Sequence, residues 1–234
     1  MSFGIEMRNQ NGSEIFTGEE TAMQYWGKLI VNKTGAGITE VTCFNIPTSF
    51  KISVYSIRGN TYEGTSFYPI LFEEGGLWKI RVTGNVGVTS TNEVYVFVEP
   101  AALPDVDYGI EFFDANGKSQ YKAIHPLLKI EGIAEAWVDP SPMVTNHSPL
   151  ISSSSKLAIQ CTHIWNKSMP PNGQIGFLYS CSSTKTPTGC SHGITETTTS
   201  GANTILSYGT FQIYNYGYID AAYYDQFSNL PNWS

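Results

Sequence analysis

Hydrophobic and polar residues alternate along much of this 234-residue chain. In residues 50–55 and 79–82 every second position is apolar, which is typical of a strand with one face buried. Residues 94–98 are apolar at every position, so we expect a central strand that is covered on both faces. No segment shows a sustained period of 3.6 residues with capping residues. The pattern therefore predicts an all-β fold.

The same pattern occurs twice. Residues 3–31 and 108–136 each begin with an aromatic residue, continue with Gly-Ile-Glu and reach Asn-Gly after the same number of positions. The displacement is 105 residues throughout, and it also relates Gly27 to Gly132. Self-similarity of this kind predicts two modules that begin in the same way.

Each copy has the sequence of a β-hairpin. An alternating strand leads to Asn11-Gly12 in the first copy and to Asn116-Gly117 in the second, and an apolar return strand follows. Asn and Gly both tolerate positive φ, so we expect a type I′ turn at each tip. The glutamates at the strand starts, Glu6 and Glu111, could be ligands, and solvent-facing strand positions explain them equally well.

The sequence Pro-Ala-Ala-Leu-Pro at residues 100–104 predicts a short, stiff linker directly before the second copy. We therefore expect two β-sandwich-like modules in tandem, an N-terminal one over residues 1–99 and a C-terminal one over residues 106–234. The second module contains a stretch of mostly Ser, Thr, Gly and Pro at residues 181–199, which predicts either an exposed loop or a long polar hairpin.

The C-terminal stretch is rich in aromatic residues. Nine of them lie between Tyr208 and Trp233, and no Lys or Arg follows Lys185. Alternation places Phe211 and Ile213 toward the core and a row of tyrosines on the opposite face, which suits a protein interface or stacking on sugars. The candidate binding and interface residues are Tyr208, Tyr214, Tyr216, Tyr218, Tyr223, Tyr224 and Trp233. The alternative is a second buried face.

Charge narrows the range of partners. Charged residues make up only 14% of the chain, the net charge is −7 and the pI is about 5.0. A chain with this balance has no basic surface for nucleic acid. It also has no apolar run long enough to span a membrane and no N-terminal signal pattern, so we expect synthesis in a cytoplasm without export by a signal peptide.

Two Cys-x-His pairs are candidate metal ligands. Cys161 with His163 and Cys190 with His192 could each present two ligands on one face of a strand. Their spacing fits no familiar zinc module, so we expect no bound metal. A disulfide between Cys181 and Cys190 is a competing possibility, and simple buried or solvated thiols are the third.

No catalytic motif is present. The sequence lacks a Gly-x-Ser-x-Gly elbow, a His-Glu-x-x-His helix and a glycine-rich phosphate loop. Its carboxylates, for example Asp105 and Asp220, show no pairing that the sequence can identify. We therefore predict no catalytic residues, no cofactor and no enzymatic activity.

The opening residues 2–16, and again residues 108–121, resemble the start of short tail-associated proteins of tailed bacteriophages. This resemblance implies a virion structural protein of the tail tip, distal tail or fibre base, made in the host cytoplasm. It implies other virion proteins and copies of the same chain as partners. Two alternatives stay open: a receptor- or glycan-binding module that contacts the host surface, and a polysaccharide depolymerase.

Overall fold

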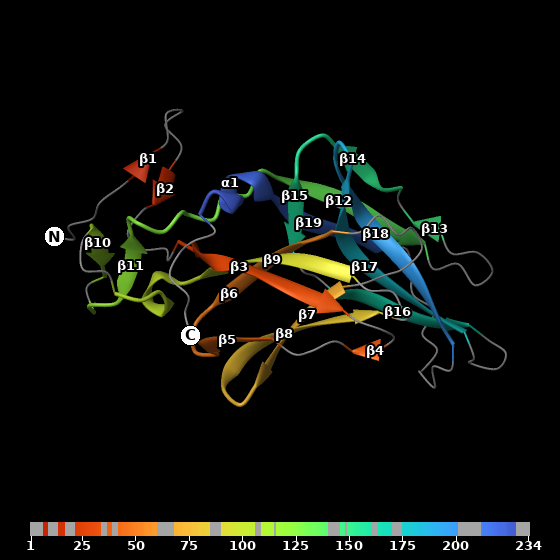
Figure 1. Ribbon diagram of the computed structural model, residues 1–234, viewed down its shortest axis with the longest axis horizontal. Coiled ribbons are helices and arrows are strands. Elements are labelled where there is room, and N and C mark those ends of the chain that lie inside the picture. The colour runs from red at the N-terminus through yellow and green to blue at the C-terminus, as the bar shows by residue number, and fades with distance from the viewer. Residues whose placement is uncertain are drawn as a thin grey trace.

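The computed structural model describes fourteen stretches of the chain (Figure 1). They are residues 7–8, 14–16, 22–33, 37–38, 42–59, 68–84, 90–105, 109–114, 116–139, 146–147, 149–160, 163–169, 175–200 and 212–227.

The described part of the chain is almost entirely β-structure, so the all-β prediction is confirmed. The strands before the linker are β1 (Met7–Arg8), β2 (Glu14–Phe16), β3 (Gln24–Lys33), β4 (Gly37–Ile38), β5 (Thr42–Pro47), β6 (Ile52–Arg58), β7 (Tyr68–Glu74), β8 (Leu77–Gly84) and β9 (Ser90–Val98). Those after it are β10 (Glu111–Phe113), β11 (Ser119–Lys122), β12 (Gly132–Asp139), β13 (Asn146–His147), β14 (Ile151–Ser153), β15 (Leu157–Gln160), β16 (His163–Met169), β17 (Ile175–Thr186), β18 (Gly189–Ser200) and β19 (Gln212–Asp220). The helical elements among the described residues are the 3-10 helix η1 (Pro100–Ala102) and the α-helix α1 (Ala221–Asp225).

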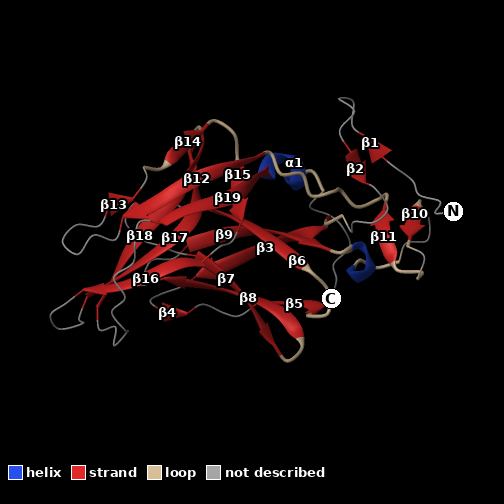
Figure 2. Cartoon of the chain, turned by 180° about the vertical axis from the view of Figure 1, so that it is seen from behind, coloured by secondary structure: helices blue, strands red, loops and turns tan. Residues whose placement is uncertain are grey.

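The described strands form two larger sheets and two small hairpins (Figure 2). Eleven strands from both halves of the chain belong to one sheet, and β4, β5, β7 and β8 form a second sheet. The hairpins β1–β2 and β10–β11 lie at the same end of the molecule, near each other in both views.

The repeat in the sequence corresponds to a repeat in strand order. In the first half β9 pairs with β3 on one side and with β6 on the other, always antiparallel. In the second half β19 pairs in the same way with β12 and β15. The two sets meet where Ser56 and Tyr55 of β6 pair antiparallel with Ile159 and Gln160 of β15. The equivalent strands β3 and β12 are therefore the outermost members of this series.

The two hairpins share one register. Met7 lies opposite Phe16 in the first copy, and Phe112 lies opposite Tyr121 in the second, which is the same pair displaced by 105 residues. Both ladders also shift register at the next position, between Met7 and Arg8 and between Phe112 and Phe113. An irregularity that recurs at the equivalent position shows that the two segments are one structural motif used twice.

The turn of the second hairpin differs from the expected type I′. Gly117 has a φ of +79°, whereas Asn116 is not among the described residues with positive φ. The turn is closed by the Gly117 N–H, which donates to the Asp114 carbonyl oxygen at 3.0 Å. Asp114 Oδ1 also accepts from the backbone N–H groups of Asn116 and Lys118, at 2.8 and 2.9 Å. Asp114 therefore stabilises the turn of the second hairpin. The expected turn at Asn11-Gly12 in the first hairpin lies outside the described residues.

β9 is a central strand, as its apolar sequence predicts. On one face Val94, Val96 and Val98 belong to a core shared by the large sheet and the second sheet, to which Phe44 of β5 and Ile80 of β8 contribute. Two sheets packed face to face around such a core make a sandwich. On the other face of β9, Tyr95 and Phe97 belong to a separate core, so neither face of residues 94–98 reaches solvent.

The second core contains residues from both halves of the chain. Tyr55 and Phe97 come from the first half, and Ile219 and Tyr224 come from the second. The strand pairing and this core therefore cross the linker at residues 100–104. The division into modules over residues 1–99 and 106–234 stays a prediction, since the two parts share one sheet.

Two lysines of the second hairpin tie it to the linker and to the end of β9. Lys122 is buried on β11, and its Nζ donates to the carbonyl oxygens of Leu103 and Pro104 at 2.9 and 3.0 Å. Lys118 Nζ lies 2.5 Å from Oε2 of the buried Glu99. The β10–β11 hairpin is therefore fixed relative to the end of β9 by charge-assisted hydrogen bonds.

The polar stretch of the second half is a long hairpin, one of the two expected forms. β17 and β18 pair along their full lengths, from Ile175 opposite Ser200 to Thr186 opposite Gly189. β14 and β16 extend this hairpin on either side. The low apolar content of the segment is compatible with a fold because backbone pairing across four strands satisfies its polar groups.

The repeated glycine has a structural role in the second copy alone. Gly132 of β12 lies opposite Tyr218 of β19, and a Cβ atom at Gly132 would approach Tyr218 Cζ to 2.6 Å. The tyrosine ring therefore covers the backbone of β12 where a side chain would otherwise stand. At the equivalent Gly27 a Cβ atom would meet nothing within 4 Å.

We expect Gly132→Ala to destabilise the protein by about 1–3 kcal/mol, because the new methyl group would displace Tyr218 from its packing. Gly27→Ala is the matched control, and it should leave the free energy of unfolding unchanged or slightly raised. Chemical denaturation of both variants measures the difference. Equal effects at the two glycines would contradict the role assigned to the Gly132–Tyr218 contact.

Candidate interaction site

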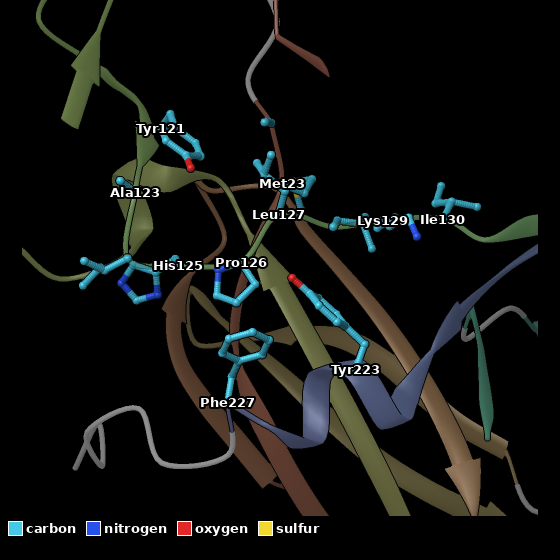
Figure 3. A pocket seen from close by; sticks show the side chains of 13 residues that line it. Met23, Tyr121, Ala123, His125, Pro126, Leu127, Lys129, Ile130, Tyr223 and Phe227 are labelled. Carbon is cyan, nitrogen blue, oxygen red and sulfur yellow. The ribbon is translucent and has the colours of Figure 1, made fainter. Parts of the chain in front are cut away.

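An apolar hollow of about 710 Å³ opens on the surface between three segments of the chain (Figure 3). Its walls are the segment that joins β11 to β12, the N-terminal end of β3 and the helix α1 with the turn after it. Met23, Pro126, Leu127, Tyr223 and Phe227 are among the side chains that line it. A hollow of this size and composition is suited to an apolar group of a partner.

The wall between β11 and β12 is held by a fully buried glutamine. Gln24 Nε2 donates to the carbonyl oxygens of Lys122 and His125, each at 2.7 Å, and its Oε1 accepts from the Lys122 N–H at 2.8 Å. The backbone at and just before the start of β3 adds two bonds to the same segment, from Tyr25 N to the Pro126 oxygen and from Leu128 N to the Met23 oxygen. Because buried polar groups are costly when unpaired, these contacts specify one path for the segment.

Tyr224 holds the same segment from the other side. Its hydroxyl group donates to the Leu127 carbonyl oxygen at 2.7 Å and accepts from the Lys129 N–H at 2.8 Å. Its ring packs edge-on against Phe97, with the ring centroids 4.9 Å apart, and lies against Tyr25 at 5.3 Å. Burial raises the pKa of the Tyr224 hydroxyl group well above its ordinary value. The hydroxyl therefore stays protonated and donates at every physiological pH.

α1 is attached to the large sheet by an ion network. Asp225 at the end of the helix pairs with Lys28 of β3 at 2.6 Å and with Lys156 just before β15, and its Oδ1 lies 2.9 Å from the Tyr95 hydroxyl oxygen. Burial opposes the charge of Asp225. The hydrogen bonds from Lys156, Lys28 and Tyr95 outweigh that effect and hold the pKa of the carboxyl group below its ordinary value.

Glu93 of β9 is the second carboxylate of this network. It pairs with Lys28 at 3.3 Å, with Lys156 at 2.6 Å and with Lys185 of β17. Tyr95 lies between the two carboxylates, because its hydroxyl oxygen is also 2.9 Å from Glu93 Oε2. Three lysines and two carboxylates from both halves of the chain thus meet on one face of the sheet and support the helix that lines the hollow.

The histidine in the wall is neutral. His125 is buried, and desolvation lowers its pKa below the ordinary value, so the ring carries no charge at pH 7. Its Nδ1 lies 3.3 Å from the Tyr25 carbonyl oxygen, which favours the tautomer with the proton on Nδ1. Lys129 at the rim pairs with Glu131 at 2.7 Å. The lining residues therefore present an apolar surface with little net charge.

The tyrosines predicted from the sequence have different positions. Tyr223 is 42% exposed and lines the hollow, whereas Tyr224 supports it from beneath. Tyr218 is partly buried against β12. Tyr214 lies on β19 opposite Ala136, and Tyr208 and Trp233 lie outside the described residues. The interface role of this set stays a prediction.

Tyr216 is not part of an outward-facing row. It is 1% exposed, and its hydroxyl oxygen lies 2.9 Å from Nδ1 of the buried His192. β19 pairs with β12 and β15, Ile219 is buried on it, and His192 of β18 covers the tyrosines. From Tyr216 to Ile219 both faces of the strand are therefore largely covered, so alternation does not separate a core face from a contact face there.

The Cys-x-His pairs do not converge in the described residues. His163 lies opposite Ser180, which lies opposite Thr195, so His163 and His192 are two strands apart and out of register by three residues. No group of three or more His, Cys, Asp or Glu side chains in the described part of the chain could hold a metal ion. Cys161 lies outside the described residues.

The proposed disulfide is excluded by the hairpin register. Cys181 lies opposite Ile194, and Cys190 lies opposite Lys185, four residues away along β17. That separation exceeds the reach of a disulfide. Cys190 is a buried, unbonded thiol.

Sequence reasoning missed the residues that build the hollow. Residues 124–130, Ile-His-Pro-Leu-Leu-Lys-Ile, are densely apolar without an alternating pattern, and that was the available signal. The role of Gln24 could not be recognised from the sequence, because single polar residues are common at the start of a strand. Its partners are about a hundred positions away.

Comparisons of the chain with models of protein families, with curated proteins and with solved structures found no match. In the stretches of chain that the structure describes, no helix is long and apolar enough to cross a membrane.

We expect Tyr224→Phe to lower the free energy of unfolding by about 1–3 kcal/mol, because it leaves the Leu127 carbonyl and the Lys129 N–H without their partner. Tyr223→Phe removes a hydroxyl group from the exposed neighbouring ring and should change stability by less than about 0.5 kcal/mol. Urea denaturation of both variants provides the measurement. If Tyr223→Phe lowered the free energy of unfolding as much as Tyr224→Phe, the role assigned to the Tyr224 hydroxyl group would be contradicted.

We expect Asp225→Asn to lower the free energy of unfolding by about 1 kcal/mol at pH 7. The value is modest because the ion pairs of Asp225 with Lys28 and Lys156 are partly exposed. A folded-state pKa below the unfolded value contributes stability above the unfolded pKa and loses it as the pH falls through the folded pKa. The difference between wild type and variant should therefore persist down to about pH 4 and disappear only as the pH falls further, through the lowered pKa of the folded state. Thermal melts across pH test this, with Glu74→Gln, at an exposed pair with Lys79, as the control. A difference that persists in acid would contradict the ionic origin.

Proposed function

We propose that this chain is a structural protein of a bacteriophage tail, a minor component of the tail tip, distal tail or fibre attachment, which assembles with other virion proteins. The apolar hollow and its exposed rim carry this proposal. Ile124, Ile130 and Tyr223 are exposed large side chains, and all three line the hollow. Monomeric proteins rarely keep such residues together in solvent, because burying them in an interface is favourable.

The β10–β11 hairpin supports the same proposal. Ile110 just before β10 and Phe113 at its end are both exposed, and the hairpin is fixed to the body of the molecule by Lys118 and Lys122. Preorganised apolar side chains on a rigid hairpin bind a partner at a low entropic cost. The resemblance of both hairpin sequences to tail-associated proteins supports a virion as the setting of that assembly.

A receptor- or glycan-binding module is the alternative. Stacking on sugars requires exposed aromatic rings. Of the candidate tyrosines whose side chains are described, Tyr223 is exposed, whereas Tyr216 and Tyr224 are buried. The described residues therefore favour assembly over sugar recognition.

The test is the composition of the virion that the gene belongs to. We expect mass spectrometry of purified tails to detect this chain, and immunogold labelling to place it on the tail. Ile130→Glu should reduce its incorporation, because a charge in the rim opposes burial. Ile151→Glu, at an exposed isoleucine on β14 away from the hollow, is the matched control. Purified particles without the chain, or binding to a glycan array by the isolated protein, would contradict the structural role.

A further inference from the structure

His125 contributes a polar atom without a partner to the wall of the apolar hollow (Figure 3). Its side chain is among those that line the hollow, and it is 2% exposed. Nδ1 lies 3.3 Å from the Tyr25 carbonyl oxygen, which can only accept, so Nδ1 carries the proton of the neutral ring. Nε2 is therefore the acceptor of the ring, and it has no hydrogen-bond partner in the described part of the chain.

The unpaired acceptor selects a ligand that carries a hydrogen-bond donor. A buried acceptor without a partner costs free energy, and a ligand that donates to it recovers this cost. Nε2 is enclosed by its surroundings, so a donor reaches it only when a side chain at the rim changes rotamer, a common event at interfaces. Ile124, which precedes His125 in the chain and is 38% exposed, lies at this rim.

The rest of the lining selects an uncharged aromatic group. Tyr223 and Phe227 form one wall, with their ring centroids 5.2 Å apart and their planes at 66°. Met23 lies on the wall beside the start of β3, and its thioether favours contact with aromatic rings. A further ring can pack edge-on or offset against these side chains. Lys129 carries a charge in this lining, but it is paired with Glu131, so the lining does not favour an ionic ligand.

Indole, the side-chain ring of tryptophan, combines these properties. It is large, apolar and uncharged, and its N–H group donates but does not accept. A phenol or an amide brings an additional acceptor, which a mainly apolar lining would leave unpaired. Tryptophan is also among the residues that contribute most of the binding energy at protein interfaces. The chemistry of the hollow therefore favours tryptophan over other donors.

We propose that the hollow holds the tryptophan side chain of a partner protein, with the indole N–H donating to His125 Nε2. This inference rests on the proposed role in assembly and names the kind of residue that the neighbouring virion protein inserts. The indole ring lies against Tyr223, Phe227 and Met23. The exposed Ile130 at the rim covers its outer edge and excludes water from the contact, as the residues around an interface hot spot do.

A matched pair of probes tests the proposal on the whole chain. N-acetyl-tryptophanamide has the N–H group, and its benzothienyl analogue has sulfur in place of that group in a ring of the same shape. Titrations followed by the methyl resonance of Met23 measure both affinities. We expect the tryptophan probe to bind about three to ten times more tightly, which is the value of one neutral hydrogen bond. Equal or reversed affinities would overturn the proposal, as would a Met23 resonance that neither probe shifts.

The nitrogen resonances of His125 locate the hydrogen bond. The tryptophan probe should shift the resonance of Nε2, and the benzothienyl probe should not. Binding of the tryptophan probe without this shift would place its donor elsewhere and overturn the proposal. His125→Phe keeps a ring but lacks the acceptor, so it should bind both probes equally. If circular dichroism shows that this variant does not fold, the Nε2 resonance of the wild type decides alone.

Variants at other positions identify the site and its occupant. Ile130→Glu at the rim should weaken the binding of both probes, whereas Ile151→Glu, at an exposed isoleucine on β14, should bind them as wild type does. Equal losses at these two positions would overturn the location. Trp233→Phe should also bind the probes as wild type does. Tighter binding by this variant would show that Trp233 of the chain itself occupies the hollow, and the assignment to a partner would be overturned.

The outcome is separate from that of the proposed function. A chain that is found in purified tails but shows no preference for the tryptophan probe retains the structural role and loses the tryptophan contact. A chain that prefers the tryptophan probe but is absent from virions retains the site and loses the assignment to a tail.

Discussion

The antiparallel contact between β6 and β15 is the interaction on which the rest of the structure depends. It is short, with Ser56 and Tyr55 opposite Ile159 and Gln160, yet it joins the two three-stranded sets into one sheet. Once they are joined, Tyr55 and Phe97 of the first half can share a core with Ile219 and Tyr224 of the second. The hollow exists because this shared core holds α1 against the sheet near the start of β3.

The two halves of the chain share a hairpin and a strand order but differ in the elements that cover these strands. Both halves begin with the same bulged hairpin and place their strands in the same order. The first half covers its strands with a second sheet, whereas the second half inserts the long β17–β18 hairpin. Residues 94–98 of β9 and residues 216–219 of β19, the central strands, are covered on both faces by these different means.

A chain with few charges uses many of them internally. Lys28, Lys156 and Lys185 neutralise Glu93 and Asp225 on the face of the sheet, and Lys122 is buried beside the linker. Charges committed in this way hold elements together but do not guard the surface. The rim of the hollow, where Ile124, Ile130 and Tyr223 are exposed, is mainly apolar.

The sequence by itself determined the all-β class, the repeated hairpin, the long polar hairpin and the central position of β9. Each follows from local periodicity or self-similarity, because side chains alternate between the two faces of a strand and equal sequences form equal local structure. Only the tertiary structure decided that Tyr216 is buried, that Gln24 and Tyr224 hold one wall, and that Lys28 meets Asp225. These contacts join residues far apart in the chain, and alternation along a strand reports whether its faces differ but does not identify what covers them.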